Sequence, residues 1–204
     1  MSLLLIRHGE TALNAARVLQ PEDTPLGEVG LRQARALAAR IAALAPAAIL
    51  ASDLPRAWQT AAAIAAATGL EPRPSPLLRE RNFGVLRGRA YDTLGFDPLA
   101  MRDAPQGGES QAAFLARVAQ AFDAMVALHA RAGGAVAVVT HGLVIQALLA
   151  RHASPAPGGA PVQGLANASL SIVGAQPPHA IALVGCTRHL EPATAGAMEN
   201  LHGG

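Results

Sequence analysis

The sequence lacks lysine, and charged residues of either sign are sparse. Its 16 basic residues are all arginine and face 14 acidic residues, which gives a formal net charge of +2. Charged residues make up 15% of the chain, too few for a disordered polyelectrolyte tail or for the basic stripe of a nucleic-acid-binding protein. We therefore expect no nucleic-acid partner.

Cysteine and long apolar runs are also scarce. The single cysteine, Cys186, excludes an intramolecular disulfide and a metal site built from several cysteines. This usage is typical of a reducing compartment and predicts a cytoplasmic location. The apolar run at residues 3–6 ends at Arg7, far short of the roughly 20 residues that span a bilayer. We expect no membrane partner.

Aromatic residues make up only 3% of the chain, whereas hydrophobic residues make up 51%. The core must therefore be built from alanine, leucine, valine and isoleucine, whose small side chains favour close packing of helices on a sheet. The length of 204 residues predicts one domain spanning residues 1–204.

Apolar runs alternate with helical periodicity along most of the chain. Buried strands are expected at residues 3–6, 47–51 and 135–139. Two further strands are expected at 168–173 and 180–184, as antiparallel neighbours near the sheet's edge. Helices are expected over residues 31–44, 56–68, 109–131 and 143–151. The alternation predicts an α/β fold, a three-layer α/β/α sandwich with a mainly parallel sheet.

Two segments have no sustained periodicity. Residues 69–108 are rich in proline, glycine and arginine, which predicts a small lid over the sheet edge. The tail from residue 192 also has no pattern, and we expect it to fray.

Two histidines directly follow predicted strands. His8 comes after the strand at residues 3–6, and His141, with Gly142 behind it, comes after the strand at 135–139. One such histidine equally suits a hydrogen-bonded structural role. Because the carboxyl ends of parallel strands share one crevice, two of them favour a site.

The residues around His8 suit a phosphate. Arg7 offers a planar guanidinium fork, Thr11 and Asn14 add neutral donors, and Gly9 lets the backbone come close to a ligand.

Two further groups are ambiguous when read alone. Arg56 enters a helix whose N-terminal N–H groups also favour an anion, but it equally fits a solvated arginine at a helix start. Glu80 stands between Arg79 and Arg81, a pattern that also fits a surface ion cluster.

Together these groups resemble the histidine phosphatase superfamily, the phosphoglycerate mutase-like proteins. The similarity covers most of the chain in the same order. It is carried by residues 5–11 with Asn14, Asp23, Pro25 and Leu26, residues 30–34, 51–61, 79–84 with Gly88, 108–110 and 139–142.

The resemblance implies a phosphatase that hydrolyses small phosphate monoesters through a phosphohistidine, without a metal or cofactor. It implies that His8 is the nucleophile and that Glu80 donates a proton to the leaving oxygen and then activates water. The phosphoryl oxygens would be held by Arg7, Arg56 and His141, assisted by Thr11, Asn14 and the Gly142 backbone. The sequence also offers no aspartate cluster for a metal.

Two other functions remain open. A cofactor-dependent phosphoglycerate mutase is favoured by residues 80–84, but the short stretch over residues 88–108 lacks the paired arginines that would hold a second phosphate. A catalytically inactive phosphoprotein-binding protein would lack one of the key residues, and all of them are present. The chain fits a monomer or a homodimer, since no long apolar surface stripe decides between them.

Substrate choice is expected to depend on the lid. Its candidate side chains are Arg87, Arg89, Tyr91 and Arg102. Arg87 stands where many phosphatases have glutamate, which predicts a more basic rim and a substrate with an extra anionic group.

Overall fold

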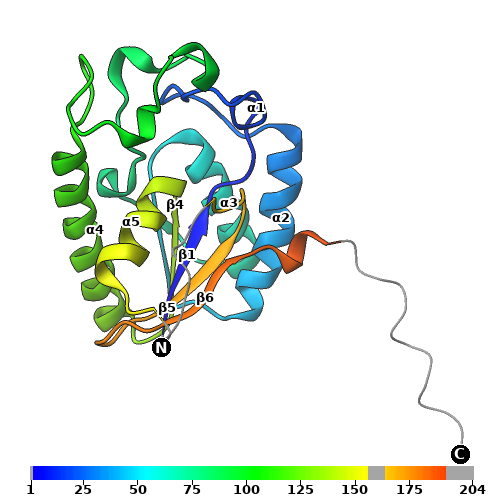
Figure 1. Cartoon of the computed structure of the whole chain (residues 1–204). Helices are drawn as coiled ribbons and strands as arrows, with labels where there is room; N and C mark the ends of the chain where they lie inside the picture. The colour runs from blue at the N-terminus through cyan, green and yellow to red at the C-terminus, as the bar shows by residue number, and fades with distance from the viewer. Residues whose placement is uncertain (1, 156–163, 192–204) are drawn as a thin grey trace, which may run out of the picture.

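The computed structural model describes residues 2–155 and 164–191, so the tail from residue 192 lies outside the described residues. Helices and strands alternate along the chain (Figure 1). The strands are β1 (Ser2–Arg7), β2 (Ala48–Ala51), β3 (Pro72–Pro74), β4 (Val136–Thr140), β5 (Leu170–Gly174) and β6 (Ile181–Cys186). The α-helices are α1 (Ala12–Ala15), α2 (Glu28–Ala43), α3 (Pro55–Thr68), α4 (Gln111–Ala132) and α5 (Gly142–His152). Short 3₁₀ helices occupy Pro76–Leu78, Gly84–Leu86, Tyr91–Thr93, Pro98–Ala100 and Arg188–Leu190.

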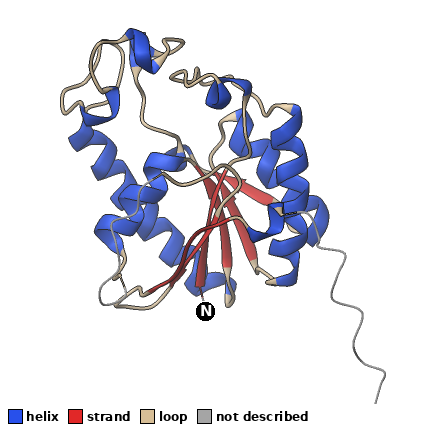
Figure 2. Cartoon of the chain, turned by 45° about the vertical axis from the view of Figure 1, so that its right-hand side comes forward, coloured by secondary structure: helices blue, strands red, loops and turns tan. Residues whose placement is uncertain are grey.

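The strands form one mainly parallel sheet in the order β3-β2-β4-β1-β5-β6. Neighbouring strands among β3, β2, β4 and β1 pair in parallel, whereas β5 is antiparallel to both β1 and β6. This confirms the predicted sheet and its antiparallel edge. The central strands are buried on both faces, because helices cover both sides of the sheet (Figure 2).

The three-layer sandwich follows from the alternation of side chains along the strands. Leu3 and Leu5 of β1 pack in a core with α4 and α5. Leu4 and Ile6 point to the other face and pack with the apolar stripes of α2 and α3. Because successive strand residues face opposite sides, a run of small aliphatic residues supplies both layers at once. Figure 1 shows α4 and α5 on one side of the sheet and α2 and α3 on the other.

The longest helix, α4, begins and ends at residues suited to those positions. Ser110 is its N-cap and accepts a hydrogen bond from the Ala113 backbone N–H at 3.1 Å. Gly133 ends the helix with φ of 68°, a left-handed conformation that favours glycine. The helix predicted for residues 109–131 is therefore confirmed with its boundaries moved by one or two residues.

The excursion predicted for residues 69–108 is only in part a lid. Pro72–Pro74 forms β3, which pairs in parallel with β2 at the edge of the sheet. The prolines conceal this strand in the sequence, because proline is disfavoured in most strands. It is accepted at the edge of a sheet, where its missing N–H costs no hydrogen bond to a neighbouring strand. The remainder, residues 75–108, is called the lid here. It lies over the carboxyl ends of the strands, beside α1 (Figure 1).

The lid is joined to the chain after α1 by backbone hydrogen bonds. Leu19 donates to the Arg89 carbonyl at 3.0 Å, Gly88 donates to the Leu19 carbonyl at 2.7 Å, and Tyr91 donates to the Arg17 carbonyl at 3.0 Å. These bonds hold the lid and the α1 loop together as the upper wall of the molecule. No helix within residues 2–155 and 164–191 has the length and apolar character to cross a membrane.

Candidate active site

His8 and His141 meet because the strands that carry them are neighbours. Arg7 at the end of β1 is level with Thr140 at the end of β4. The His8 backbone N–H donates to the Thr140 carbonyl at 3.0 Å, which extends the pairing by one residue. The two imidazole rings lie with their centroids 5.1 Å apart at an interplanar angle of 61°. The two strand-end histidines therefore share one edge of the sheet, as the sequence predicts.

The His8 ring is held as a neutral imidazole. Its Nδ1 donates to the Gly9 carbonyl at 2.7 Å, because a carbonyl oxygen can only accept. Nε2 therefore carries the free lone pair. His8 is 2% exposed, and its burial, together with the charges of Arg56 and Arg7, holds its pKa well below the ordinary value. A neutral ring is the form that attacks phosphorus.

Gly9 has a packing role rather than the ligand-facing role expected from the sequence. A Cβ at this position would lie 2.6 Å from the Gly30 carbonyl oxygen in the first turn of α2. The Gly9 N–H donates to Thr60 Oγ1 of α3 at 3.1 Å. Glycine here lets the chain after His8 pass between two helices, which fixes the direction of the His8 backbone.

His141 is completely buried and is oriented by Ser52 at the end of β2. His141 Nε2 and Ser52 Oγ are 2.8 Å apart. The Ser52 oxygen already accepts a hydrogen bond from the Leu54 N–H at 3.3 Å, so its own proton is free to go to His141 Nε2. That arrangement leaves the proton of the neutral ring on Nδ1. Burial, with the Arg56 charge next, lowers the His141 pKa well below its ordinary value.

Two arginines flank the histidines, the half-buried Arg7 and the buried Arg56. Arg7 ends β1 and donates to the Leu165 carbonyl, while Arg56 is 2% exposed in the first turn of α3 and donates to the Pro21 carbonyl at 3.2 Å. Burial lowers the pKa of Arg7, and it lowers that of Arg56 to about 10. No carboxylate of the described residues forms an ion pair with either guanidinium. Both charges are therefore available to an anion.

Three buried donors next to His8 have no hydrogen-bond partner in the part of the chain that the structure describes. They are Arg7 Nε, Arg56 Nε and His141 Nδ1. Unpartnered buried donors cost stability, and native proteins rarely keep them without a reason. An anion beside His8 would supply acceptors to the two guanidinium groups, which line the cavity. Within residues 2–155 and 164–191, no three His, Cys, Asp or Glu side chains gather as metal ligands would.

Glu80 lines the cavity, and neither neighbouring arginine forms an ion pair with it. Arg79 pairs with Asp53, its Nε donating to Oδ1 at 2.7 Å, and Arg81 Nε donates to the Glu109 carbonyl at 3.2 Å. The surface ion cluster is therefore the wrong interpretation of this triplet. Burial raises the Glu80 pKa, against the opposing effects of two backbone hydrogen bonds and of the two pocket arginines. A raised pKa keeps more of the carboxyl protonated, as a proton donor requires.

A cavity of about 520 Å³ opens beside these groups, beneath the lid. Its lining includes Arg7, His8, Arg56, Glu80, Asn14 and Gly142 from the predicted set. His141 lies behind this surface with 0% exposure. Thr11 also stays behind the lining, because its hydroxyl caps α1 and donates to Gln20 Oε1 at 2.8 Å. The expectation that Thr11 donates to substrate is corrected to a supporting contact.

Two side chains that face this region are missing from the predicted set. Gln20 lines the cavity. Its Oε1 accepts a hydrogen bond from the Thr11 hydroxyl, which leaves the amide nitrogen of Gln20 as a donor for other groups. Asn167, just before β5, donates to the His8 carbonyl at 3.2 Å. Asn167 gives no sequence signal, because it is uncharged and no motif surrounds it. Gln20 lies close to the histidine motif and could have been found from that position.

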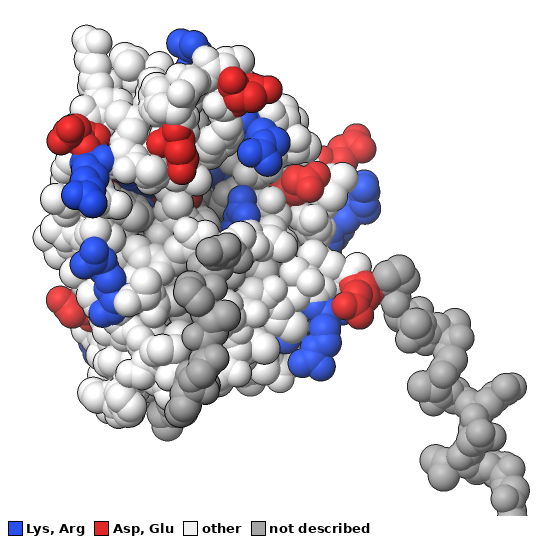
Figure 3. All heavy atoms as spheres, viewed as in Figure 1, with Lys and Arg blue, Asp and Glu red and all other residues white. Residues whose placement is uncertain are grey.

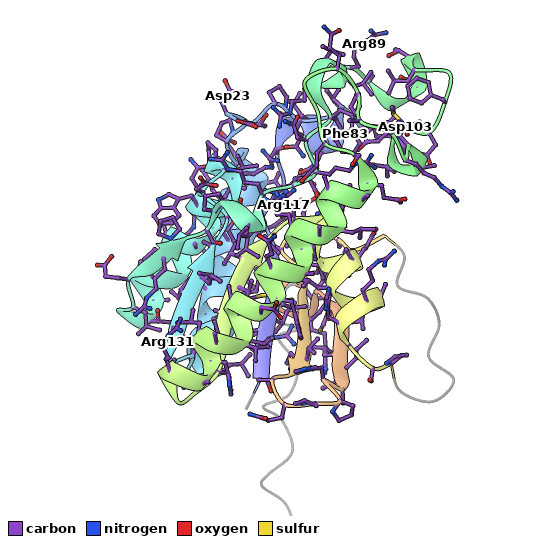
Figure 4. The ribbon with its side chains drawn as sticks, turned by 90° about the vertical axis from the view of Figure 1, so that its left-hand side faces the viewer. Asp23, Phe83, Arg89, Asp103, Arg117 and Arg131 are labelled. Atoms are coloured by element: carbon purple, nitrogen blue, oxygen red, sulfur yellow. The ribbon has the colours of Figure 1, made fainter. Side chains whose placement is uncertain are left out.

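The rim is less basic than the sequence indicates. Arg87 lines the cavity, but it pairs with Glu22 across the mouth at 2.7 Å. Arg89 lies at the outer end of the lid, away from the lid's junction with α4 (Figure 4), and neither Arg89 nor Arg102 lines the cavity. On the face seen in Figure 3, basic and acidic side chains are dispersed among each other. The predicted excess of positive charge at the rim is therefore offset.

Comparison with known proteins decides the family. The model of the histidine phosphatase superfamily, branch 1, matches residues 3–184. The chain belongs to this superfamily. The matched range includes both strand-end histidines, both pocket arginines, Glu80 and the lid.

The proteins similar to this chain include both mutases and a phosphatase by name. A probable phosphoglycerate mutase GpmB of Yersinia pestis is 38% identical over 159 residues, 73% of each chain. A mycobacterial glucosyl-3-phosphoglycerate phosphatase, solved with VO3, is 31% identical, with a TM-score of 0.72 over 85% of this chain and 90% of that one. A phosphoglycerate mutase of Thermus thermophilus is 31% identical, with a TM-score of 0.65 over 89% and 96%. The fold is therefore phosphoglycerate mutase-like, and phosphatase or mutase activity is supported.

Proposed function

We propose that this protein is a phosphatase that hydrolyses small phosphate monoesters through a phosphohistidine on His8, without a metal. The observation that carries the proposal is the set of three unpartnered buried donors around a neutral His8. Two guanidinium groups and an imidazole N–H attract an anion and disfavour a cation. A phosphoryl group fits both their charge and their number.

In the first half-reaction, the lone pair on His8 Nε2 attacks phosphorus, and the bond from phosphorus to the ester oxygen breaks. The bonding electrons leave with the ester oxygen, which takes the proton of the Glu80 carboxyl and departs as an alcohol. Arg7 and Arg56 hold the phosphoryl oxygens while charge develops on them. The raised pKa of Glu80 suits this step, since the carboxyl must start protonated.

In the second half-reaction, the Glu80 carboxylate takes a proton from water as the water oxygen attacks phosphorus. The bond from phosphorus to His8 Nε2 breaks, which returns a neutral imidazole and releases inorganic phosphate. Glu80 regains its proton, so the cycle closes without a co-reactant.

A phosphoglycerate mutase is the second candidate, and the names of two relatives favour it. A mutase must hold a substrate that carries a carboxylate beside its phosphate, and it must return the phosphoryl group to an alcohol. Two lid arginines line the cavity: Arg87 is already paired with Glu22, and Arg81 donates to the Glu109 carbonyl. Hydrolysis requires no further cation, so we propose water as the acceptor.

The deciding experiment is the release of inorganic phosphate from a panel of phosphate monoesters with a chelator present. We expect chelator-resistant turnover in the wild type and none in His8→Ala. His152→Ala is the matched control, because His152 is a half-buried histidine of α5 that does not line the cavity. The control should turn over like the wild type.

Three outcomes would contradict the proposal. Turnover by His8→Ala would exclude His8 as the nucleophile. Transfer of the phosphoryl group from phosphorylated enzyme to monophosphoglycerates in preference to water would establish the mutase. Phosphoprotein binding without any turnover would favour the inactive binding protein instead.

A further inference from the structure

The cavity extends well beyond the groups that would hold a phosphate. We call its remaining part the leaving-group compartment and define it by the side chains of Leu13, Val18, Tyr91, Leu99, Leu143 and Leu165. Leu13 and Val18 come from the α1 region, Tyr91 and Leu99 from the lid, and Leu143 from the start of α5. The compartment therefore lies where the alcohol part of a phosphate ester would extend from His8.

The size of the cavity indicates a bulky alcohol. Its volume of about 520 Å³ lies within the roughly 300–1,000 Å³ typical of pockets for drug-sized molecules. A three-carbon phosphate ester would leave most of that space to water. Five of the six defining side chains are aliphatic, and apolar walls favour a ligand that displaces this water.

The charges in the same region cancel. Arg87 pairs with Glu22, and the cavity's remaining outer charges, Arg17 and Asp97, are of opposite sign. The formal charges of these four side chains sum to zero, so a second anionic group on the substrate would find no net positive charge among them.

Arg81 is the other cation that the cavity touches, and it is held in place. It is 4% exposed, its Nε donates to the Glu109 carbonyl at 3.2 Å, and its guanidinium lies 5.3 Å from the centre of the Phe83 ring. Phe83 lies where the lid meets the upper end of α4 (Figure 4). The Glu109 charge also faces Arg81, although the Glu109 carboxylate is paired with Arg117, and Arg81 Nη2 has no hydrogen-bond partner among the described residues.

We infer that the leaving-group compartment takes an uncharged, largely apolar alcohol, so that the preferred substrates are phosphate monoesters of aryl or alicyclic alcohols rather than phosphoglycerates. The inference rests on the proposed function, because it places the reacting phosphate at His8. It names a substrate class that none of the relatives' names contains. Leu99 is the specificity residue with which the lid covers the ring of the alcohol.

The test uses binding, so that it does not depend on turnover. Calorimetry compares three ligands: methylphosphonate, benzylphosphonate and 3-phosphonopropionate. They share the phosphonate but differ in what enters the compartment: a methyl group, an aromatic ring or a carboxylate. We expect benzylphosphonate to bind at least about ten-fold tighter than methylphosphonate with a more negative heat-capacity change. The carboxylated ligand, 3-phosphonopropionate, should bind no more tightly than methylphosphonate.

The lid offers a matched pair of variants. Leu99→Gln changes an aliphatic side chain that lines the cavity, and Val85→Gln changes one on the lid that does not. Both side chains are exposed, at 39% for Leu99 and 60% for Val85, so neither substitution opens a buried core. Leu99→Gln should reduce the preference for benzylphosphonate about three-fold, and Val85→Gln should leave it unchanged.

Each other outcome overturns the inference. Tighter binding of the carboxylated ligand would assign the compartment to acidic substrates. Equal binding of the methyl and benzyl ligands, or equal effects of the two variants, would show that the compartment does not contact the alcohol. If no phosphonate binds and no ester is hydrolysed, the phosphate site itself is absent, and the proposed function falls together with this inference.

Discussion

Asn167 orients Asn14 by a side-chain hydrogen bond, its Nδ2 donating to Asn14 Oδ1 at 3.1 Å. The Thr11 backbone N–H donates to the same oxygen at 3.2 Å. Because the oxygen of Asn14 is occupied on this side, its amide nitrogen must point the other way, as a donor beside His8. Asn167 also donates to the His8 carbonyl, so one side chain positions both groups.

This relationship predicts coupling between the two asparagines. Asn167→Ala should lower kcat/KM by about ten-fold, the equivalent of one lost hydrogen bond of about 1.4 kcal/mol. In an Asn14→Ala background the same change should cost clearly less, because the group that it orients is gone. A double-mutant cycle on kcat/KM measures the coupling. Fully additive effects would show that Asn167 acts only on the backbone or on stability.

Glu80→Gln should separate substrates by their leaving groups. Alkyl phosphate turnover should fall by roughly 10²- to 10⁴-fold, because the alkoxide leaves poorly without a proton. A nitrophenyl ester needs no such proton, so it should still phosphorylate the enzyme. The amide cannot activate water, and we expect a burst of about one nitrophenol per site followed by a slow phase. Equal losses for both esters would exclude Glu80 as the proton donor.

The pH profile should follow the same carboxyl. The pKa of Glu80 is raised by burial, so the fall in alkyl phosphate turnover with rising pH should begin above the ordinary range of a glutamate. The low pKa of His8 keeps the nucleophile neutral well below pH 6.5. Turnover should therefore extend far into the acidic range. Rates measured from acidic to alkaline pH, beside Glu80→Gln, test this: the variant should lose the alkaline limb.

Ser52→Ala should weaken catalysis by releasing His141. Without the Ser52 hydroxyl on Nε2, the ring can take its other tautomer and lose the Nδ1 donor. We expect kcat to fall about ten-fold, as for one donor of about 1.4 kcal/mol. Ser171→Ala is the control, since Ser171 is equally buried and accepts from the Gly185 N–H far from the cavity. Equal kcat values in the two variants would contradict the prediction.

The two buried histidines should make the fold sensitive to acid. Their pKa values are lowered in the folded state, so below about pH 6.5 the unfolded chain binds protons that the folded chain does not. The free energy of unfolding should then fall as pH drops from 7.5 to 5.5. In His141→Gln this fall should be smaller by about 1 kcal/mol, measured by denaturant titration at both pH values. An unchanged pH dependence would show that His141 binds protons equally well in the folded and the unfolded chain.

The sequence predicts the sandwich well because its signals are local. Residues 3–6 must be buried on both sides, and the periodicity of α4 repeats over six turns. The positions of His8 and His141 at strand ends then bring them together, since strand order and parallel pairing determine that edge.

The missed features depend on contacts between distant segments. β3 contains two prolines and exists only because β2 offers a partner. Gly9 faces Gly30 rather than a ligand, and Arg87 is neutralised by Glu22. None of these pairs is adjacent in the sequence, and composition alone does not predict which charges meet.

The position of β1 also governs how the chain is assembled during synthesis. It precedes the other five strands of the sheet in the chain, yet its partners β4 and β5 occupy Val136–Thr140 and Leu170–Gly174. Such long-range pairing is slow, because the entropy of the intervening chain must be lost before the strand contacts contribute any stabilising energy. Until then the apolar residues of β1 have no sheet to enter and are exposed to aggregation or to a chaperone. A chain that is still being synthesised thus contains the His8 motif before the strands and the lid that form its pocket are in place.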